Sequence, residues 1–147
     1  MSDTTKSETL NLENQICFSL YSAANAMIRA YRPLLAALDL TYPQYLAMLV
    51  LWEHDGISVK VLGEKLHLDS GTLTPLLKRL EGKGLVIRAR SIEDERMRVL
   101  NLTERGVRLN AQAQAIPEMM KCKIKGMEID LLAFKKACDL LHAQLTD

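Results

Sequence analysis

The chain has 147 residues, of which 48% are hydrophobic and 5% aromatic, and its formal net charge is +1 at pH 7. This length is enough for one domain with a hydrophobic core and falls short of two. No stretch approaches about 18 consecutive apolar residues and the N-terminus lacks a signal-peptide pattern, so we expect a soluble, cytoplasmic protein. The three cysteines lack close spacing, which argues against a secreted disulfide framework or a metal site, and we expect no metal or cofactor.

Two helical patterns occupy the first third of the chain. Apolar residues keep returning to one face over residues 10–38, and Pro33 should kink this helix or end its first segment. After a turn, Thr41 and Gln44 have the spacing of a capping box at the start of a second helix. That helix is apolar nearly all round, which predicts a buried, central position.

Residues 58–102 carry the pattern of a winged helix-turn-helix. A short helix leads to a turn at 67–69 and to a second helix over 70–81, whose leucines share one face. Two strands follow at 85–90 and 97–102, joined by a charged tip. Helix, turn, helix and a two-stranded ribbon together predict this fold.

The opposite face of the 70–81 helix is the candidate reading surface. It is small and hydroxyl-bearing near its start and basic further on, which suits close approach to base edges and phosphates. Residues 58–108 hold 11 Lys and Arg against 7 Asp and Glu, a net charge of +4, whereas the remainder of the chain carries −3. We therefore predict DNA binding, with a merely solvated helix face or a protein–protein module as alternatives.

The C-terminal part predicts two more helices. Thr103 should cap a helix that runs to about residue 116, where Pro117 interrupts it. Residues 121–126 are polar and suggest a loosely held stretch. The last helix carries a heptad-like apolar stripe around Cys138, which we expect to be part of the core.

The two ends of the chain are the predicted dimer interface. The helices of residues 10–38 and 104–147 have more apolar face than one core of this size needs. The predicted architecture is therefore a single, mainly α domain over residues 1–147, with about six helices and a two-stranded β-wing, forming a homodimer. Two-fold symmetry would place two reading helices about one DNA turn apart, roughly 34 Å.

Cys17 is the candidate chemical centre. A cysteine on an apolar helix face is more often a small buried hydrophobe, and a reactive thiol is the alternative. Tyr21 lies one turn away, but Tyr31 lies about 21 Å along the helix and cannot reach Cys17 in the same chain. An antiparallel helix from a second subunit could bring Tyr31 and Tyr42 to Cys17, where hydroxyl donors would stabilise the thiolate that attacks a peroxide.

The central module resembles the MarR family of dimeric winged-helix regulators. The resemblance rests on residues 68–81, on 84–86, and on 93–96 with 102–103. Three further segments are similar to the organic hydroperoxide resistance regulators (the OhrR group) within that family: residues 12–18, 31–35 and 41–46.

This resemblance implies a redox-sensing transcriptional repressor, not an enzyme, that binds double-stranded DNA at an inverted-repeat operator. Cys17 would be oxidised by an organic hydroperoxide, with Tyr21 nearby and the partner's Tyr31 and Tyr42 as thiolate-stabilising donors. Arg96 would enter the minor groove from the wing tip, braced by Asp94. The residues expected to face the major groove are Ser70, Thr72, Thr74, Lys78 and Arg79.

The fate of oxidised Cys17 stays open at this point. The family includes sensors that use a small thiol and sensors that use a second cysteine of the opposite subunit. Cys122 lies among three lysines whose charge favours a thiolate, so an intersubunit Cys17–Cys122 disulfide is our expectation, with Cys138 as the other candidate. The remaining alternatives are a repressor released by a small aromatic ligand and a thiol peroxidase.

Overall fold

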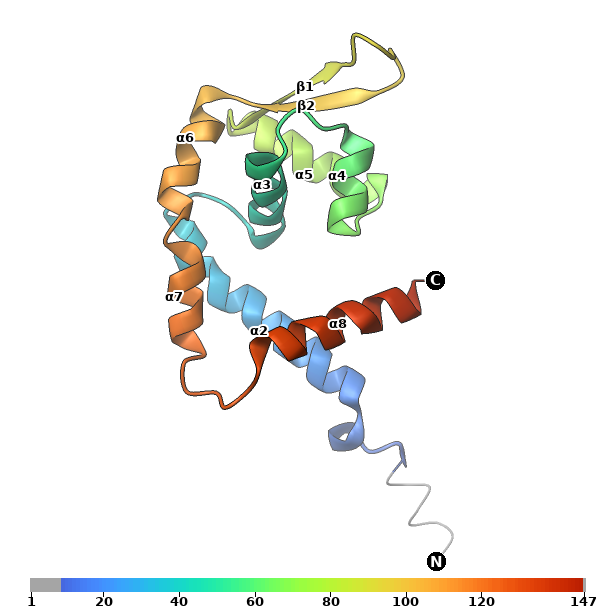
Figure 1. Ribbon diagram of the computed structural model, residues 1–147, viewed down its shortest axis with the longest axis vertical. Coiled ribbons are helices and arrows are strands. Elements are labelled where there is room, and N and C mark those ends of the chain that lie inside the picture. The colour runs from blue at the N-terminus through green and yellow to red at the C-terminus, as the bar shows by residue number, and fades with distance from the viewer. Residues whose placement is uncertain (1–8, 147) are drawn as a thin grey trace, which may run out of the picture.

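The computed structural model describes residues 9–146, which are mainly helical with one two-stranded antiparallel sheet. Figure 1 shows the helix-turn-helix and the wing at one end of the molecule, with much of α2 and α8 towards the other. None of the helices within the described residues has the length and apolar character that crossing a membrane requires. In chain order the elements are the 3₁₀-helix η1 (Leu12–Asn14), α2 (Ile16–Ala36), α3 (Tyr42–Glu53), α4 (Val59–Leu66), α5 (Ser70–Gly82), β1 (Val86–Arg90), β2 (Arg98–Leu102), α6 (Glu104–Ala113), α7 (Ile116–Lys123) and α8 (Leu131–Leu145).

Helix α2 differs at its start from the predicted first helix. It begins at Ile16 rather than near residue 10, because the backbone is extended at Asn11 and at Gln15, on either side of η1. Pro33 lies inside α2, and the helix continues to Ala36, so Pro33 does not end it.

The corner between α2 and α3 is closed by the predicted capping box. Asp39 turns the chain in the left-handed region, with φ 54°. Thr41 Oγ1 accepts the backbone N–H of Gln44 over 3.3 Å, and Gln44 Oε1 accepts the backbone N–H of Thr41 over 3.2 Å. The predicted central position of α3 is confirmed by its buried apolar side chains, which are Tyr45, Ala47, Met48 and Leu51.

The helix-turn-helix is confirmed, with a side-chain cap at the start of each helix. Ser58 Oγ accepts the backbone N–H of Val61 over 3.1 Å at the start of α4, which ends at His67 in the left-handed region. Asp69 is the N-cap residue of α5, the second helix of the motif. The predicted apolar face of α5 is buried in the core and consists of Leu73, Leu76, Leu77 and Leu80.

The wing is also confirmed, to within one residue at each strand. Strands β1 and β2 pair antiparallel from Val86 opposite Leu102 to Arg90 opposite Arg98. Val86 is buried at the base of the ribbon, whereas both arginines near its tip are exposed. The wing is therefore attached to the core at one end and presents its charged end to solvent (Figure 1).

Two expectations about the C-terminal part are wrong. Residues 116–123 form a helix, α7, so Cys122 lies in a helical last turn and not in a loose stretch. Pro117 lies in the first turn of α7, where a missing N–H is tolerated. Cys138 is half-buried and none of the residues of α8 is buried, so its apolar stripe is not part of this chain's core.

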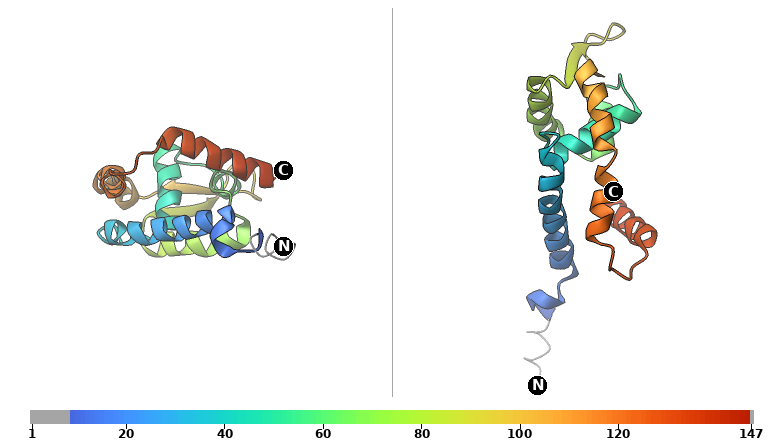
Figure 2. Two further views of the ribbon diagram at one scale, coloured as in Figure 1. Left: turned by 90° about the horizontal axis from the view of Figure 1, so that it is seen from below. Right: turned by 90° about the vertical axis from the view of Figure 1, so that its left-hand side faces the viewer.

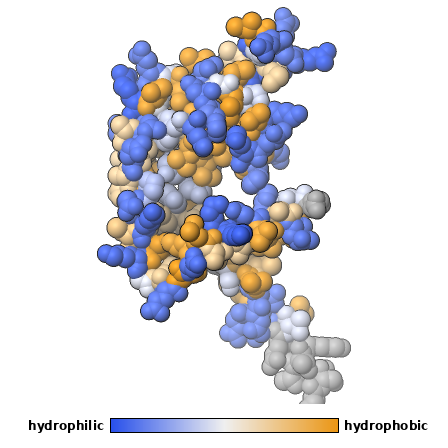
Figure 3. All heavy atoms as spheres, in the orientation of Figure 1, coloured by the Kyte–Doolittle hydropathy of each residue, from blue (hydrophilic) through white to orange (hydrophobic). Residues whose placement is uncertain are grey.

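Helices α2 and α8 leave large apolar side chains exposed. The two helices cross in the view of Figure 1, and Figure 2 shows them in separate layers. Apolar side chains gather over this lower part of the molecule (Figure 3). On α2 the exposed ones are Ile16, Phe18, Leu20, Tyr21 and Met27; on α8 they are Leu131, Leu132, Phe134, Leu140, Leu141 and Leu145.

Candidate functional site

The exposed face of α5 carries the predicted reading residues. Ser70, Thr72, Lys78 and Arg79 are exposed, and Thr74 is half-buried at the edge of this face. The buried leucines on the opposite side fix the rotation of α5 about its axis. All five side chains therefore lie on or beside one solvent-facing surface, with hydroxyls near the N-terminus and cations in the second half.

The first turn of α5 is held by Asp69. Its Oδ1 accepts the backbone N–H of Thr72 over 2.8 Å. This hydrogen bond, together with further donors from Thr72 and Gly71, holds the pKa of Asp69 below its ordinary value of 3.8. The ionised carboxylate is favourable beside the positive end of the helix dipole and stabilises the first turn of α5.

The wing tip is a tight turn that projects Arg96 into solvent. Ser91 Oγ accepts the backbone N–H groups of Glu93 and Asp94 over 3.2 and 3.4 Å. Asp94 Oδ1 accepts the backbone N–H of Arg96 over 3.0 Å. Asp94 thus braces the backbone of the turn, and within residues 9–146 no carboxylate pairs with the Arg96 guanidinium.

Two further exposed arginines of the wing were not predicted to bind DNA from the sequence. Arg90 and Arg98 lie directly opposite each other in the ladder, both exposed, and neither has an acidic partner among the described residues. Arg88, by contrast, donates from Nε to Glu81 over 2.6 Å. Like charges that face each other across a ladder destabilise the free sheet. A polyanionic partner such as DNA would neutralise the charges of Arg90 and Arg98 and remove this repulsion.

Cys17 is an exposed free thiol at the start of α2, with Tyr21 one turn further along. Tyr31 lies in the same helix, about 21 Å away at the rise of an α-helix. Cys17 and Tyr31 are therefore not part of one site within a single chain.

The structure brings Tyr31 and Tyr42 together. Their ring centroids are 4.7 Å apart, and Tyr45, which the sequence analysis did not select, lies 5.8 Å from Tyr31. Burial raises the pKa of all three above the ordinary 10.0, with the neighbouring tyrosines adding to this effect at Tyr42 and Tyr45. The hydroxyls stay protonated at neutral pH and remain hydrogen-bond donors.

The other two cysteines lie on separate helices. Cys122 is exposed in the last turn of α7, beside Lys121, which pairs with Glu118 over 3.5 Å. Cys138 is half-buried on α8. All three cysteines are free thiols. Within residues 9–146 there is no cluster of three or more His, Cys, Asp or Glu side chains that could hold a metal ion.

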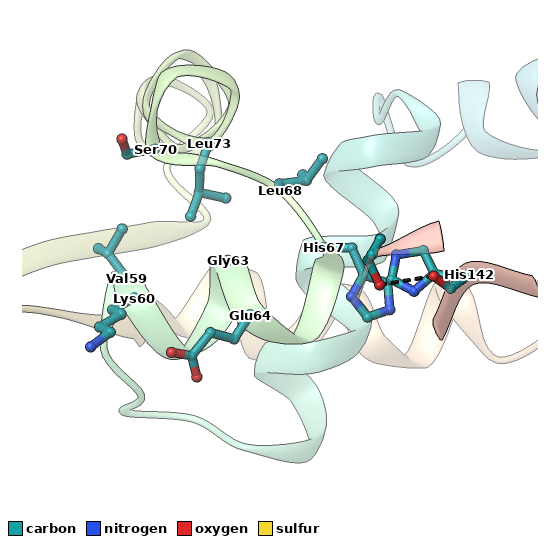
Figure 4. A pocket seen from close by; sticks show the side chains of 10 residues that line it. Val59, Lys60, Gly63, Glu64, His67, Leu68, Ser70, Leu73 and His142 are labelled. Carbon is teal, nitrogen blue, oxygen red and sulfur yellow. Dashed lines mark hydrogen bonds between the residues drawn. The ribbon is translucent and has the colours of Figure 1, made fainter. Parts of the chain in front are cut away.

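An open cavity of about 720 Å³ lies between the helix-turn-helix and the end of α8. Figure 4 shows His67, at the end of α4, stacked on His142 of α8, with ring centroids 3.9 Å apart. Cys17 and the tyrosine cluster do not line this cavity. It is therefore separate from the candidate redox residues.

Comparison with known proteins identifies the family. Residues 40–97 match the model of the MarR family. The chain is 50% identical over 132 residues to the organic hydroperoxide resistance transcriptional regulator of Bacillus subtilis (strain 168), covering 90% of each. It is 51% identical over 130 residues to the HTH-type transcriptional regulator TtmR of Methylorubrum extorquens (strain PA1), covering 88% of this chain and 66% of TtmR.

Solved structures agree with this assignment. AbfR, known from Staphylococcus epidermidis, matches in its reduced, DNA-bound form with a TM-score of 0.79 at 33% identity, covering 95% of this chain and 99% of AbfR. Its disulfide form matches with a TM-score of 0.60 at 34% identity, covering 96% of this chain and 98% of AbfR. With the helix-turn-helix, the wing and these relatives, the chain belongs to the MarR family of winged-helix, DNA-binding transcriptional regulators.

Proposed function

We propose that this chain is a homodimeric repressor that releases its operator when an organic hydroperoxide oxidises Cys17. The observation that carries the proposal is the pairing of Tyr31 with Tyr42, two half-buried hydroxyl donors with raised pKa values that lie far from Cys17 of their own chain. The 50% identity to a hydroperoxide resistance regulator supports the same chemistry.

A second copy of the chain would complete the redox site. The exposed apolar faces of α2 and α8 supply the surface for a two-fold interface. If two α2 helices pack antiparallel, Cys17 of one subunit lies near Tyr31 and Tyr42 of the other. Their hydroxyls would then donate to the sulfur and favour the thiolate, which is the nucleophilic form of cysteine.

The oxidation can be written in two balanced steps. The Cys17 thiolate attacks the terminal oxygen of the hydroperoxide, the O–O bond breaks, and with one proton the products are the sulfenic acid and an alcohol. A second thiol then attacks the sulfenic sulfur, forming a disulfide and releasing water.

We propose the partner's Cys122 as that second thiol. It is exposed at the surface, and lysines flank it on both sides in the sequence. Because Cys122 lies in the last turn of α7, forming the disulfide requires this turn to shift or unwind. The lower TM-score against disulfide-formed AbfR than against its reduced, DNA-bound form indicates that the AbfR chain differs in shape between these two states, which is compatible with a rearrangement on oxidation.

DNA release then follows from the geometry of the dimer. Two reading helices contact successive major grooves only if their separation matches about one turn of DNA, roughly 34 Å. A disulfide between Cys17 and the partner's Cys122 would pull on α2 and α7, rotate the winged modules and break this spacing.

The test measures binding to a duplex with the sequence upstream of the gene for this chain, before and after cumene hydroperoxide. Wild type should release the duplex while Cys17→Ser keeps it. On a non-reducing gel the oxidised wild type should run as a dimer, and Cys122→Ser should lose this band while Cys138→Ser keeps it.

Three outcomes would contradict the proposal. Equal responses of wild type and Cys17→Ser would favour a repressor released by a small ligand. A dimer band that persists in Cys122→Ser would remove Cys122 as the second thiol. Continuous consumption of the peroxide with thioredoxin, without DNA binding, would indicate a peroxidase.

A further inference from the structure

Three helix ends meet at the side chain of Lys83. Lys83 is the C-cap residue of α5, and its ammonium donates to Gln44 Oε1 over 2.8 Å and to the backbone carbonyl of Asp39. The Asp39 carboxylate lies 3.9 Å from the same nitrogen. Asp39 follows the end of α2, and Gln44 lies in the first turn of α3, so one cation joins the end of the reading helix to the corner between α2 and α3.

The charges at this junction favour a lysine. The positive group lies at the C-terminal ends of α2 and α5, where the helix dipoles attract a cation. Gln44 Oε1 also accepts the backbone N–H of Thr41, so Lys83 binds the same oxygen that closes the capping box of α3. Only 25% of the Lys83 side chain is exposed and Gln44 is buried, so their hydrogen bond is shielded from water, whereas the Asp39 carboxylate is 86% exposed and its attraction to Lys83 is screened.

Within residues 9–146, Lys83 donates hydrogen bonds that join α5 to this corner; Leu35 of α2 and Leu80 of α5 belong to the same buried apolar core. Apolar burial has no preferred direction, whereas a hydrogen bond has a preferred direction and distance. Movement of the corner is therefore passed to α5 most directly through Lys83.

The proposed redox site lies in the same turn. Tyr42 is the first residue of α3, two positions before Gln44, and its ring packs on Tyr31 near the end of α2. Any shift of these tyrosines when the partner's Cys17 is oxidised displaces the first turn of α3, and with it the oxygen that Lys83 binds.

We propose that Lys83 is a positioning residue that couples the tyrosine cluster to the reading helix and so converts oxidation of Cys17 into movement of α5. This inference rests on the proposed function. It assigns no DNA contact to Lys83; its side chain acts through Gln44 and Asp39.

The test uses Lys83→Met, which keeps the aliphatic stem and removes the ammonium, and Lys83→Arg, which restores the charge. Dissociation constants for the same duplex are measured before and after cumene hydroperoxide, and Cys17 oxidation is followed in parallel by mass spectrometry of the alkylated protein. In Lys83→Met, Cys17 should oxidise at the wild-type rate, while the ratio of oxidised to reduced dissociation constant falls at least about tenfold. Lys83→Arg should recover most of that ratio.

A second variant of the junction and one control complete the test. Asp39→Asn keeps a residue that tolerates φ 54° and keeps the carbonyl, so it should fold and give an intermediate ratio. Arg105→Met removes an exposed cation from the first turn of α6 and should leave the ratio unchanged.

The outcomes are distinguishable. A Lys83→Met protein with the wild-type ratio overturns the inference and leaves the proposed function standing, even if its affinity for DNA falls in both states. If wild type itself keeps its DNA after Cys17 is oxidised, the proposed function fails and this inference fails with it.

Discussion

Replacing Arg98 with glutamine should weaken DNA binding without making the free protein less stable. In the wing, Arg98 faces Arg90 across the ladder, and neither side chain has a carboxylate partner among the described residues. Removing one of the two charges relieves a repulsion of roughly 0.2 to 0.5 kcal/mol, at the low end because both groups are exposed and screened by salt. The thermal midpoint of the variant should therefore equal or slightly exceed that of wild type.

The same substitution should weaken DNA binding, and this loss should be larger than the small gain in the stability of the free protein. A dimer carries two copies of Arg98, so the variant loses two phosphate contacts if each arginine makes one. Each contact contributes about 0.9 to the slope of log affinity against log salt concentration, so the slope should become shallower by about 1.8. Between 50 and 200 mM salt, wild type should lose about 12-fold more affinity than the variant.

The assay is fluorescence anisotropy of a labelled duplex at four salt concentrations under reducing conditions. Lys121→Gln is the matched control, because it removes an exposed cation from α7, away from the wing, and should keep the wild-type slope. A wild-type slope in Arg98→Gln, or an equal change of slope in both variants, would exclude a phosphate contact by Arg98.

Three further predictions concern the stability of the fold, with every variant measured in its reduced form and at the same protomer concentration. Gly106→Ala should lower the free energy of unfolding by about 2 kcal/mol or more, because a Cβ at Gly106 would lie 2.2 Å from the carbonyl oxygen of Leu85. Gly82→Ala should leave the stability unchanged or raise it, because a Cβ at that position would have no packing neighbour within 4 Å. Equal midpoints of the two variants in thermal unfolding would contradict this prediction. Leu77→Ala should cost about 2 to 5 kcal/mol in urea unfolding because Leu77 is fully buried, and a loss below about 1 kcal/mol would show that the site collapses around the smaller side chain. Asp69 has a lowered pKa in the folded state, so its stabilisation is present above the ordinary value of 3.8 and is lost as the pH falls through the folded value. The gap in thermal midpoint between wild type and Asp69→Asn should therefore narrow below pH 3.8, and a gap that is constant with pH would exclude this role of the carboxylate.

The helices and the wing could be predicted because local signals mark their ends. Thr41, Ser58, Asp69 and Thr103 each cap a helix through a hydrogen bond to a backbone N–H three residues later. Such caps depend on sequence spacing alone, so the sequence predicts those of Thr41, Ser58 and Thr103, whereas Asp69 was assigned to the turn before α5 and not to its cap. The leucine face of α5 is predictable for the same reason, since helical periodicity fixes which side chains share a face.

Features that depend on distant segments escaped prediction. Arg90 and Arg98 lie in strands that were predicted, but their pairing follows from the register, which the geometry of the wing tip decides. Tyr42 and Tyr45 are neighbours through their i, i+3 spacing in α3, but both meet Tyr31 only because α3 packs across the end of α2, and sequence spacing does not give that packing.

The errors at the C-terminal end have two physical causes. Residues 121–126 were judged by their charge, but the helix that Pro117 opens extends through Cys122. Cys138 was placed in the core because its stripe is apolar, yet the described residues of this chain leave that stripe unburied. An apolar pattern predicts that a helix face is buried, but it does not show whether that face packs against its own chain or against a second subunit.

The most direct test of the account follows Cys17 oxidation and DNA release in the same single-turnover reaction. A labelled duplex bound to the reduced dimer is mixed with cumene hydroperoxide, anisotropy records release, and quenched samples give the fraction of oxidised Cys17 by mass. We predict that release never precedes oxidation and that Tyr31→Phe with Tyr42→Phe slows both, because the thiolate loses its hydroxyl donors. DNA release that precedes Cys17 oxidation, or that proceeds at the wild-type rate in Cys17→Ser, would show that oxidation of Cys17 is not the signal for release.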